Sequence, residues 1–457
     1  MKKEKTDVIT KQNTKQVEQK IEKQKEKKKD KKPLRKKQLA WDKLDNTANL
    51  FPVIANEDMT NVYRISVNLT EEIDRVLLQE ALNRILPQFS TFRMRLRMGF
   101  FWYYFEENMH SAPIVREEYS HPGAYIDKSR NHHYMFRVTY HKCRINLEVF
   151  HVLTDGAGGL IFLKELVYQY LRLRYPEILE HDKDKISAGI FLDKEDSYVE
   201  NFKKGHSKVY KSERALTLTG ERVPKGEMGV MHGYLPVDQL KCASKSYGVT
   251  INQYLVGTFV YAVYKNYLKC QPSKYPIRCC VPVNLRPYYN SHTMKNFFAM
   301  VFATFQPERD DYTFEEVLEI VAKDLKEQIT PENLDNIMSY NVSNEKKWIL
   351  RAVPLVIKNI VLKHVYGMST KATTSTVTNI GNIELKEPYQ QYVDNFTAIL
   401  SMSKGQNMKG TVCSYNGVLT FTFSSVLMDT AIQRAFFGKL VEDGVTVSIE
   451  SNGVMYE

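Results

Sequence analysis

Short runs in which apolar and polar residues alternate recur along most of this chain. A period of two predicts β-strands that bury one face. The runs with this pattern are residues 61–69, 92–98, 100–105, 134–140, 144–150, 276–285, 297–305, 375–383, 397–402, 410–415 and 417–424. The last two runs meet at Asn416-Gly417, a dipeptide that favours a tight hairpin turn.

Between these strands the apolar residues recur at helical spacing. The segments with this spacing are residues 71–86, 160–173, 236–247, 251–268, 314–329 and 431–441. Thr70, Thr250 and Thr313 precede three of these helices, and a threonine hydroxyl can accept a hydrogen bond from a free N–H group of the first turn. Pro87 and Gly248 are expected to end two of the helices. The alternation of strands and helices predicts an α+β fold.

Residues 351–366 are both basic and amphipathic, and two interpretations fit this pattern. An ordinary helix packed on the core, with Pro354 near its start, is the preferred one. A helix that lies on a membrane surface, near a lipophilic substrate, is the alternative. The longest apolar run, Leu255 to Tyr264, is about half as long as a membrane span requires.

The positive charge of the chain is concentrated at its N-terminus. The net charge is +11, and residues 1–38 hold 16 of the 64 Lys and Arg residues but only 6 of the 53 Asp and Glu residues. The remainder is nearly neutral, so a fold with a basic face is disfavoured and no specific nucleic acid is expected. Residues 1–38 have few large apolar side chains, and we expect a disordered Lys-rich arm that contacts an anionic membrane or RNA weakly.

The cysteine and histidine residues predict neither a disulfide framework nor a metal site. The six cysteines form no CxxC pair, and the first residues lack a secretory apolar segment, so we expect a cytoplasmic protein, free or peripheral to a membrane. His132, His133 and His141 flank a hairpin without acidic or cysteine partners at ligand spacing. No metal and no tightly bound cofactor are expected.

One local motif has a chemical rationale, HVLTDGAGG at residues 151–159. It lies between a predicted buried strand and a predicted helix, where a fold can present a side chain rigidly. A histidine there can act as a general base, since its ordinary pKa is about 6.5. Asp155 can turn back beneath the loop, and Gly156 permits tight or left-handed backbone. An incidental histidine and a helix-capping aspartate would produce the same pattern.

The order of these elements around the HxxxDG motif resembles the CoA-dependent acyltransferase superfamily, which has the chloramphenicol-acetyltransferase-like fold. Within it, the chain is most similar to the bacterial alcohol acetyltransferase group. The segments that carry the resemblance are WDKLDNTANLFP (41–52), RMRLRMGFFWYYFEEN (93–108), EVFHVLTDGAGGLIFLKEL (148–166), YGVTINQYLVGTFVYAV (247–263), VPVNLRPYY (281–289) and TNIGNI (378–383).

The resemblance implies a domain organisation with two α/β sandwich halves of two layers each. Residues 39–185 would form an N-terminal acyltransferase subdomain with the HxxxDG motif, and residues 231–457 a C-terminal one. Residues 186–230 would be the crossover linker between them, and the arm 1–38 lies outside the resemblance.

The resemblance also implies a mechanism. His151 would take the proton from an alcohol, or an amine, as it attacks the thioester of acetyl-CoA or another acyl-CoA, and no covalent intermediate would form. Asp155 would hold the loop by pairing with an arginine, for which Arg286 in VPVNLR is the candidate. Acyl-CoA and an alcohol acceptor are therefore the expected partners.

Further site residues are expected in the second half. Asn379 and Gly381 occupy the segment that lines the tunnel in relatives, and Ser375 or Thr376 could direct a hydroxyl toward the oxyanion. Phe150 stands where many condensation domains have a second histidine, which disfavours condensation on a carrier protein. The alternatives are a non-catalytic or carrier-protein-dependent protein that binds acyl thioesters, and a protein that binds RNA or a membrane through its arm.

Overall fold

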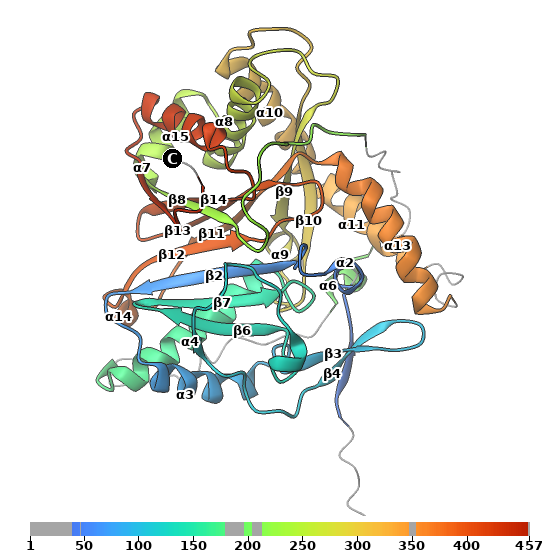
Figure 1. Cartoon of the computed structure of the whole chain (residues 1–457), viewed down its shortest axis with the longest axis vertical. Helices are drawn as coiled ribbons and strands as arrows, with labels where there is room; N and C mark the ends of the chain where they lie inside the picture. The colour runs from blue at the N-terminus through green and yellow to red at the C-terminus, as the bar shows by residue number, and fades with distance from the viewer. Residues whose placement is uncertain (1–38, 46, 179–195, 203–212, 347–352, 456–457) are drawn as a thin grey trace, which may run out of the picture. The chain divides into compact units, whose positions relative to one another are not determined.

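The computed structural model of the protein describes residues 39–45, 47–178, 196–202, 213–346 and 353–455. The arm expected over residues 1–38 lies outside the described residues. Within residues 42–457, helices cover a five-stranded and a seven-stranded sheet (Figure 1). This mixed arrangement confirms the expected α+β fold class.

The five-stranded sheet carries the strand that leads into the HxxxDG motif. Its strands, in spatial order, are β12 (Val393–Leu400), β2 (Val62–Leu69), β7 (Arg144–Phe150), β6 (Phe136–His141) and β5 (Arg116–Glu117). The helices α3 (Arg75–Ile85) and α4 (Gly156–Arg174) pack together on one face (Figure 1). Strand β12 belongs to the C-terminal part of the chain, yet it pairs with β2 in antiparallel register. A strand from the C-terminal part of the chain therefore completes the sheet that carries the motif.

The seven-stranded sheet is formed by the C-terminal part of the chain. Its order is β10 (Phe298–Phe305), β9 (Ile277–Asn284), β11 (Ser375–Ile383), β13 (Met408–Tyr415), β14 (Val418–Ser425), β8 (Gly229–Pro236) and β15 (Ser448–Ser451). Its main covering helices are α7 (Val237–Ser246), α8 (Ile251–Asn266), α10 (Phe314–Gln328) and α15 (Ala431–Glu442), and they bury a large apolar core against it (Figure 1). Strand β11 is parallel to both β9 and β13.

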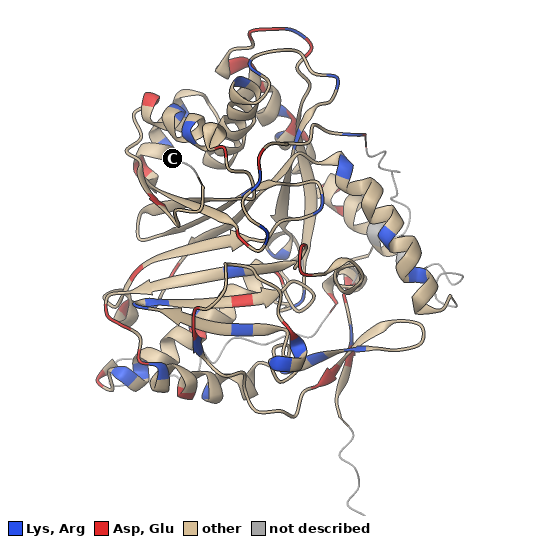
Figure 2. Ribbon diagram, viewed as in Figure 1, with Lys and Arg blue, Asp and Glu red and all other residues tan. Residues whose placement is uncertain are grey.

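Shorter elements connect and flank these sheets. They are β1 (Trp41–Lys43), α2 (Phe51–Ile54), η1 (Leu86–Gln88), β3 (Met94–Met98), β4 (Tyr103–Glu107), η2 (Lys128–Arg130), α6 (Ser197–Glu200), α9 (Arg286–Tyr289), α11 (Pro331–Lys346), α13 (Leu355–Ser369), η3 (Thr370–Ala372) and α14 (Glu387–Gln390). Figure 2 shows Lys and Arg residues interspersed with Asp and Glu residues over the fold as a whole.

Two of the three expected helix caps are confirmed and one is wrong. Thr250 and Thr313 each accept a hydrogen bond from the backbone of a first-turn residue and form capping boxes. Helix α3 instead begins after Asp74, whose carboxylate accepts hydrogen bonds from two first-turn N–H groups. Thr70 cannot cap it, because the Thr70 and Ile73 N–H groups are still bonded to carbonyls of other segments.

Other boundaries also differ from the sequence pattern. Helix α4 begins at Gly156, four residues before the expected start, because Asp155 caps it. Strand β8 was not predicted, and it occupies Gly229–Pro236 at the end of the expected crossover, so the next helix starts only at Val237. Strand β4 starts at Tyr103, since the turn after Gly99 extends through Trp102.

Helix α13 lies where an ordinary packed helix was preferred, and it is not one. Of its residues only Leu355 is buried, whereas most of its large apolar side chains are about half exposed or more: Val356, Ile357, Ile360, Val361, Val365 and Met368. Its first turn is attached to the β3–β4 turn by the Leu355 N–H, which donates to the carbonyl of Phe100. Among the described residues, no helix is long and apolar enough to cross a membrane.

Candidate active site

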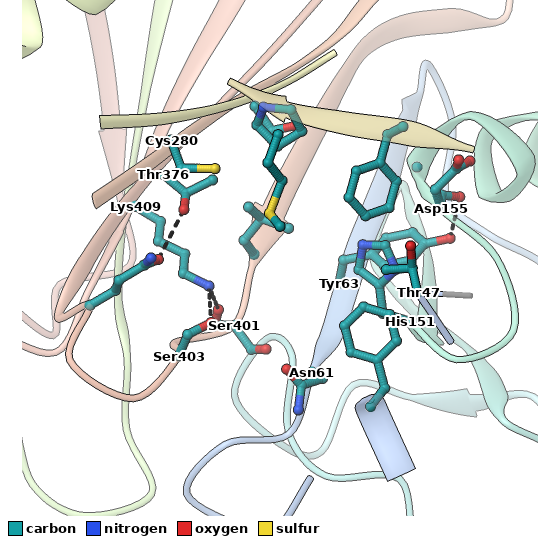
Figure 3. Close-up of a pocket in the computed structure, with 18 of the residues that line it drawn as sticks. Thr47, Asn61, Tyr63, His151, Asp155, Cys280, Thr376, Ser401, Ser403 and Lys409 are labelled. Atoms are coloured by element: carbon teal, nitrogen blue, oxygen red, sulfur yellow. Dashed lines mark hydrogen bonds between the residues drawn. The ribbon is translucent and has the colours of Figure 1, made fainter. Parts of the chain in front are cut away.

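A cavity of about 380 Å³ is bounded by residues from both sheets. His151, from the loop after β7, lines it together with side chains of β9, β10, β11 and β13. Figure 3 shows His151 and Lys409 on opposite sides of this pocket. Much of the wall is apolar, with Leu50, Phe51, Val62, Phe298, Met300, Phe302, Ile380 and Leu400 among the lining residues.

His151 is held by backbone and ring contacts. Its N–H donates to the carbonyl of Asn61, which precedes β2. The ring of Phe51 stacks on the imidazole with centroids 4.8 Å apart, and the ring of Tyr63 meets it edge-on at 5.2 Å. These contacts place the imidazole at the cavity wall in one orientation.

A chain of hydrogen bonds determines which imidazole nitrogen is basic. Nδ1 of His151 lies 2.9 Å from Oδ1 of Asn296, and Nδ2 of Asn296 donates to Oδ2 of buried Asp45 at 2.9 Å. Because the Asn296 amide nitrogen is used by Asp45, its oxygen faces His151 and accepts from Nδ1–H. The lone pair of the neutral ring is then on Nε2, which remains for a substrate. Burial raises the pKa of Asp45 to about 7.

The pKa of His151 is lowered from its ordinary value of 6.5. Burial is the main cause, because it disfavours the charged imidazolium, and the positive charge of Lys409 acts in the same direction. The negative charge of Asp155 and the hydrogen bond to Asn296 oppose the shift but do not cancel it. The ring is therefore neutral at pH 7 and can accept a proton.

Asp155 has a capping role and an ion-pairing role at once. Its Oδ1 accepts from the Gly158 N–H at 3.1 Å, which caps α4. Two Arg286 nitrogens donate to its two oxygens at 2.9 and 3.0 Å, and the Phe297 N–H donates to Oδ2 at 2.9 Å. Burial alone would raise the pKa of Asp155, but Arg286 and these N–H donors lower it below the ordinary value. The loop after β7 is thereby attached to α9.

Two glycines of the motif, Gly158 and Gly159, are needed for close packing rather than for left-handed backbone. None of Gly156, Gly158 and Gly159 has a positive φ, since all three lie in the first turn of α4. A Cβ on Gly158 would lie 2.0 Å from Oγ1 of Thr154, and one on Gly159 would lie 2.5 Å from the Tyr63 hydroxyl. Gly156 itself lines the cavity.

The residues expected in the tunnel divide into two groups. Thr376 and Asn379 line the cavity, whereas Ser375 and Gly381 do not. Ser375 follows the alternation of β11 onto the opposite face, where its buried hydroxyl donates to the carbonyl of Met408, so it cannot face a substrate. The Thr376 hydroxyl donates to Oε1 of Gln406, and Figure 3 shows Thr376 on the side away from His151, which does not fit an oxyanion donor.

Three site residues were missed by the sequence interpretation: Asp45, Asn296 and Lys409. Asp45 stands inside the segment WDKLDNTANLFP that contributed to the resemblance, but its role depends on a partner 251 residues away. Lys409 immediately precedes the strand that the pattern predicted from Gly410. In the part of the chain that the structure describes, no group of three or more His, Cys, Asp or Glu side chains could hold a metal ion.

No protein-family model and no curated protein matches this sequence. Several solved structures match its fold. Polyketide synthase associated protein 5 from Mycobacterium tuberculosis is 12% identical, with a TM-score of 0.54 over 87% of this chain and 97% of that one. The trichothecene 15-O-acetyltransferase TRI3 from Fusarium sporotrichioides is 11% identical, with a TM-score of 0.56 over 89% and 94%.

A condensation domain is similar to the same extent. The starter condensation domain of rhizomide synthetase, as a mutant in complex with C8-CoA and Leu-SNAC, is 11% identical, with a TM-score of 0.54 over 88% of this chain and 94% of that one. The narrower resemblance to bacterial alcohol acetyltransferases stays a prediction. The chain has the fold that condensation domains share with these acyltransferase-like proteins.

Proposed function

We propose that this protein transfers an acyl group from acyl-CoA to an alcohol, with His151 as the general base and without a covalent intermediate. The observation that carries the proposal is the hydrogen bond from His151 Nδ1 to Asn296, which leaves a basic Nε2 at the wall of a largely apolar cavity. The fold similarity to an O-acetyltransferase, and to a domain crystallised with an acyl-CoA, supports the same chemistry.

The proposed reaction balances without any group besides the two substrates. Nε2 of His151 takes the hydroxyl proton while the oxygen attacks the thioester carbonyl carbon. The tetrahedral intermediate then collapses, the carbon–sulfur bond breaks, and the imidazolium returns the proton to the thiolate, so that CoA leaves as a thiol. Asp155 and Arg286 act as positioning residues that hold the loop.

The alternative is a protein of this fold that binds acyl thioesters without transfer, or one that condenses substrates on a carrier protein. Phe150, rather than a second histidine, precedes His151, which favours the first proposal over carrier-protein condensation. Weak contact of residues 1–38 with an anionic membrane or RNA stays a prediction, because these residues lie outside the described part of the chain.

The test is release of CoA thiol from acetyl-CoA in the presence of a panel of alcohols and amines. His151→Ala should lower the rate about 10²–10⁴-fold, as expected for loss of a general base, without unfolding the protein. His141→Ala is the matched control, because His141 is exposed at the end of β6 and does not line the cavity. Equal rates for wild type and His151→Ala would contradict the mechanism. Acyl-CoA binding without turnover would favour the non-catalytic alternative.

A further inference from the structure

One row of side chains crosses the cavity wall opposite His151. Phe302 on β10 pairs with Cys280 on β9, Cys280 with Thr376 on β11, and Thr376 with Lys409 on β13. Residues directly paired on neighbouring strands point to the same face of a sheet. All four line the cavity, so Lys409 belongs to its wall.

Lys409 is a buried cation, with 6% of its surface exposed. Its Nζ donates to the carbonyl of Ser401 at 2.8 Å and to the hydroxyl of Ser403 at 2.6 Å (Figure 3). An ammonium group has three hydrogens, so one remains for the cavity. Burial lowers the pKa of Lys409 to about 8, which keeps it mostly protonated at pH 7.

Lys409 differs from the buried cations Arg64 and Lys295 in having no ion pair with an Asp or Glu among the described residues. Arg286 pairs with Asp155, and Lys295 pairs with Asp42. A buried charge is costly unless a counter-charge is present. Because Lys409 lines the cavity, the missing counter-charge fits a group on a bound molecule.

A second donor is linked to Lys409 through Thr376, the strand partner of Lys409. Gln406 also lines the cavity, and its Oε1 accepts from the Thr376 hydroxyl at 2.9 Å. This leaves the Gln406 amide nitrogen as a donor. A carboxylate can accept several hydrogen bonds and carries one charge, which one ammonium neutralises, whereas a phosphate dianion would leave a charge uncompensated.

We propose that Lys409, together with Gln406, binds a carboxylate of a substrate whose reacting group lies at His151. The inference rests on the proposed acyl transfer and narrows its substrate class. The carboxylate belongs either to the acceptor, which is then a hydroxy acid, or to the acyl group, which is then a dicarboxylic half-thioester of CoA. The chemistry recognised is the same in both cases.

The experiment compares matched charged and uncharged substrates on the full-length protein. One arm combines acetyl-CoA with ω-hydroxy acids of increasing length and with their primary amides. The other combines simple alcohols with succinyl-CoA and with butyryl-CoA. Calorimetry measures binding of each hydroxy acid, amide and acyl-CoA in parallel, so that the carboxylate preference is obtained even without turnover.

Wild type should prefer the carboxylate in one of the two arms, and that arm identifies its source. Lys409→Met should lower the affinity for the carboxylate substrate by about 30-fold or more, while the affinity for its uncharged partner stays nearly the same. Lys409→Gln, which keeps a donor without the charge, should show the same loss if the methionine variant does not fold. Lys404→Met is the matched control, since Lys404 is exposed in the loop that precedes β13 and does not line the cavity.

Two results would overturn this proposal. One is a wild type that binds each carboxylate and its uncharged partner equally in both arms. The other is a folded Lys409 variant that retains the preference. If no substrate is acylated, the proposed function fails, yet a carboxylate preference in binding that depends on Lys409 would still support the subsite.

Discussion

Replacement of Arg286 by methionine should destabilise the protein strongly, because it leaves Asp155 buried without a cation. The Arg286 guanidinium donates to both Asp155 oxygens and to the carbonyls of Thr293 and Lys295. Side-chain exposure is 11% for Arg286 and 9% for Asp155, so water screens the pair little. Removing one partner of a buried pair costs about 3–5 kcal/mol of folding free energy.

The size of this loss should depend on pH. In wild type the pKa of Asp155 lies below its unfolded value, so its stabilisation is complete above that value and is lost as the pH falls through the folded pKa. In Arg286→Met the pKa of Asp155 is set only by its burial and by the remaining N–H donors, and burial raises it. The variant should therefore be most impaired near pH 7 and should approach wild type toward pH 4. Urea unfolding at several pH values measures the difference.

A double-mutant cycle tests whether the two residues are coupled, and an exposed ion pair serves as the control. Asp155→Asn combined with Arg286→Met should lose less than the sum of the two single losses, since no uncompensated charge remains. Arg84→Met is the control, because the Arg84–Glu80 pair is exposed and should be worth at most about 1 kcal/mol. An Arg286→Met variant as stable as Arg84→Met, or strictly additive losses, would refute the reasoning.

The geometry of the base leads to two more predictions. The neutral imidazole is the reactive form, so kcat/KM should fall only as the pH drops through the pKa of His151, which lies below 6.5. Lys409→Met should move this fall to higher pH, because it removes a cation that lowers the pKa of His151. An unmoved pH profile would show that His151 and Lys409 are not coupled. Asn296→Ala should lower kcat about 10²-fold, because the His151 ring is no longer held in one orientation. It should also move the fall of kcat/KM to lower pH, since the hydrogen bond from Nδ1–H favours the charged imidazolium. A wild-type kcat would show that Asn296 does not position the base.

Local patterns in the sequence predicted most of the elements correctly. The capping boxes at Thr250 and Thr313 involve residues only three positions apart, so composition and spacing suffice to locate them. The expected Thr70 cap was wrong because residues 70–73 are still bonded to Tyr392 and Lys142, which are distant in sequence. The packed helix preferred for α13 was wrong, since amphipathic spacing does not say whether another element covers the apolar side.

The sequence by itself determined the motif of the candidate site and the order of strands and helices around it. HxxxDG is contiguous, so His151 and Asp155 could be identified, and Arg286 could be named as a partner through the resemblance. Tertiary structure alone decided what surrounds them. Asn296 meets His151 across 145 residues of chain and Asp45 across 251, and Lys409 joins the cavity through the register of β9, β11 and β13. Such contacts depend on which strands become neighbours, and sheet pairing over long distances has no local signature in a sequence.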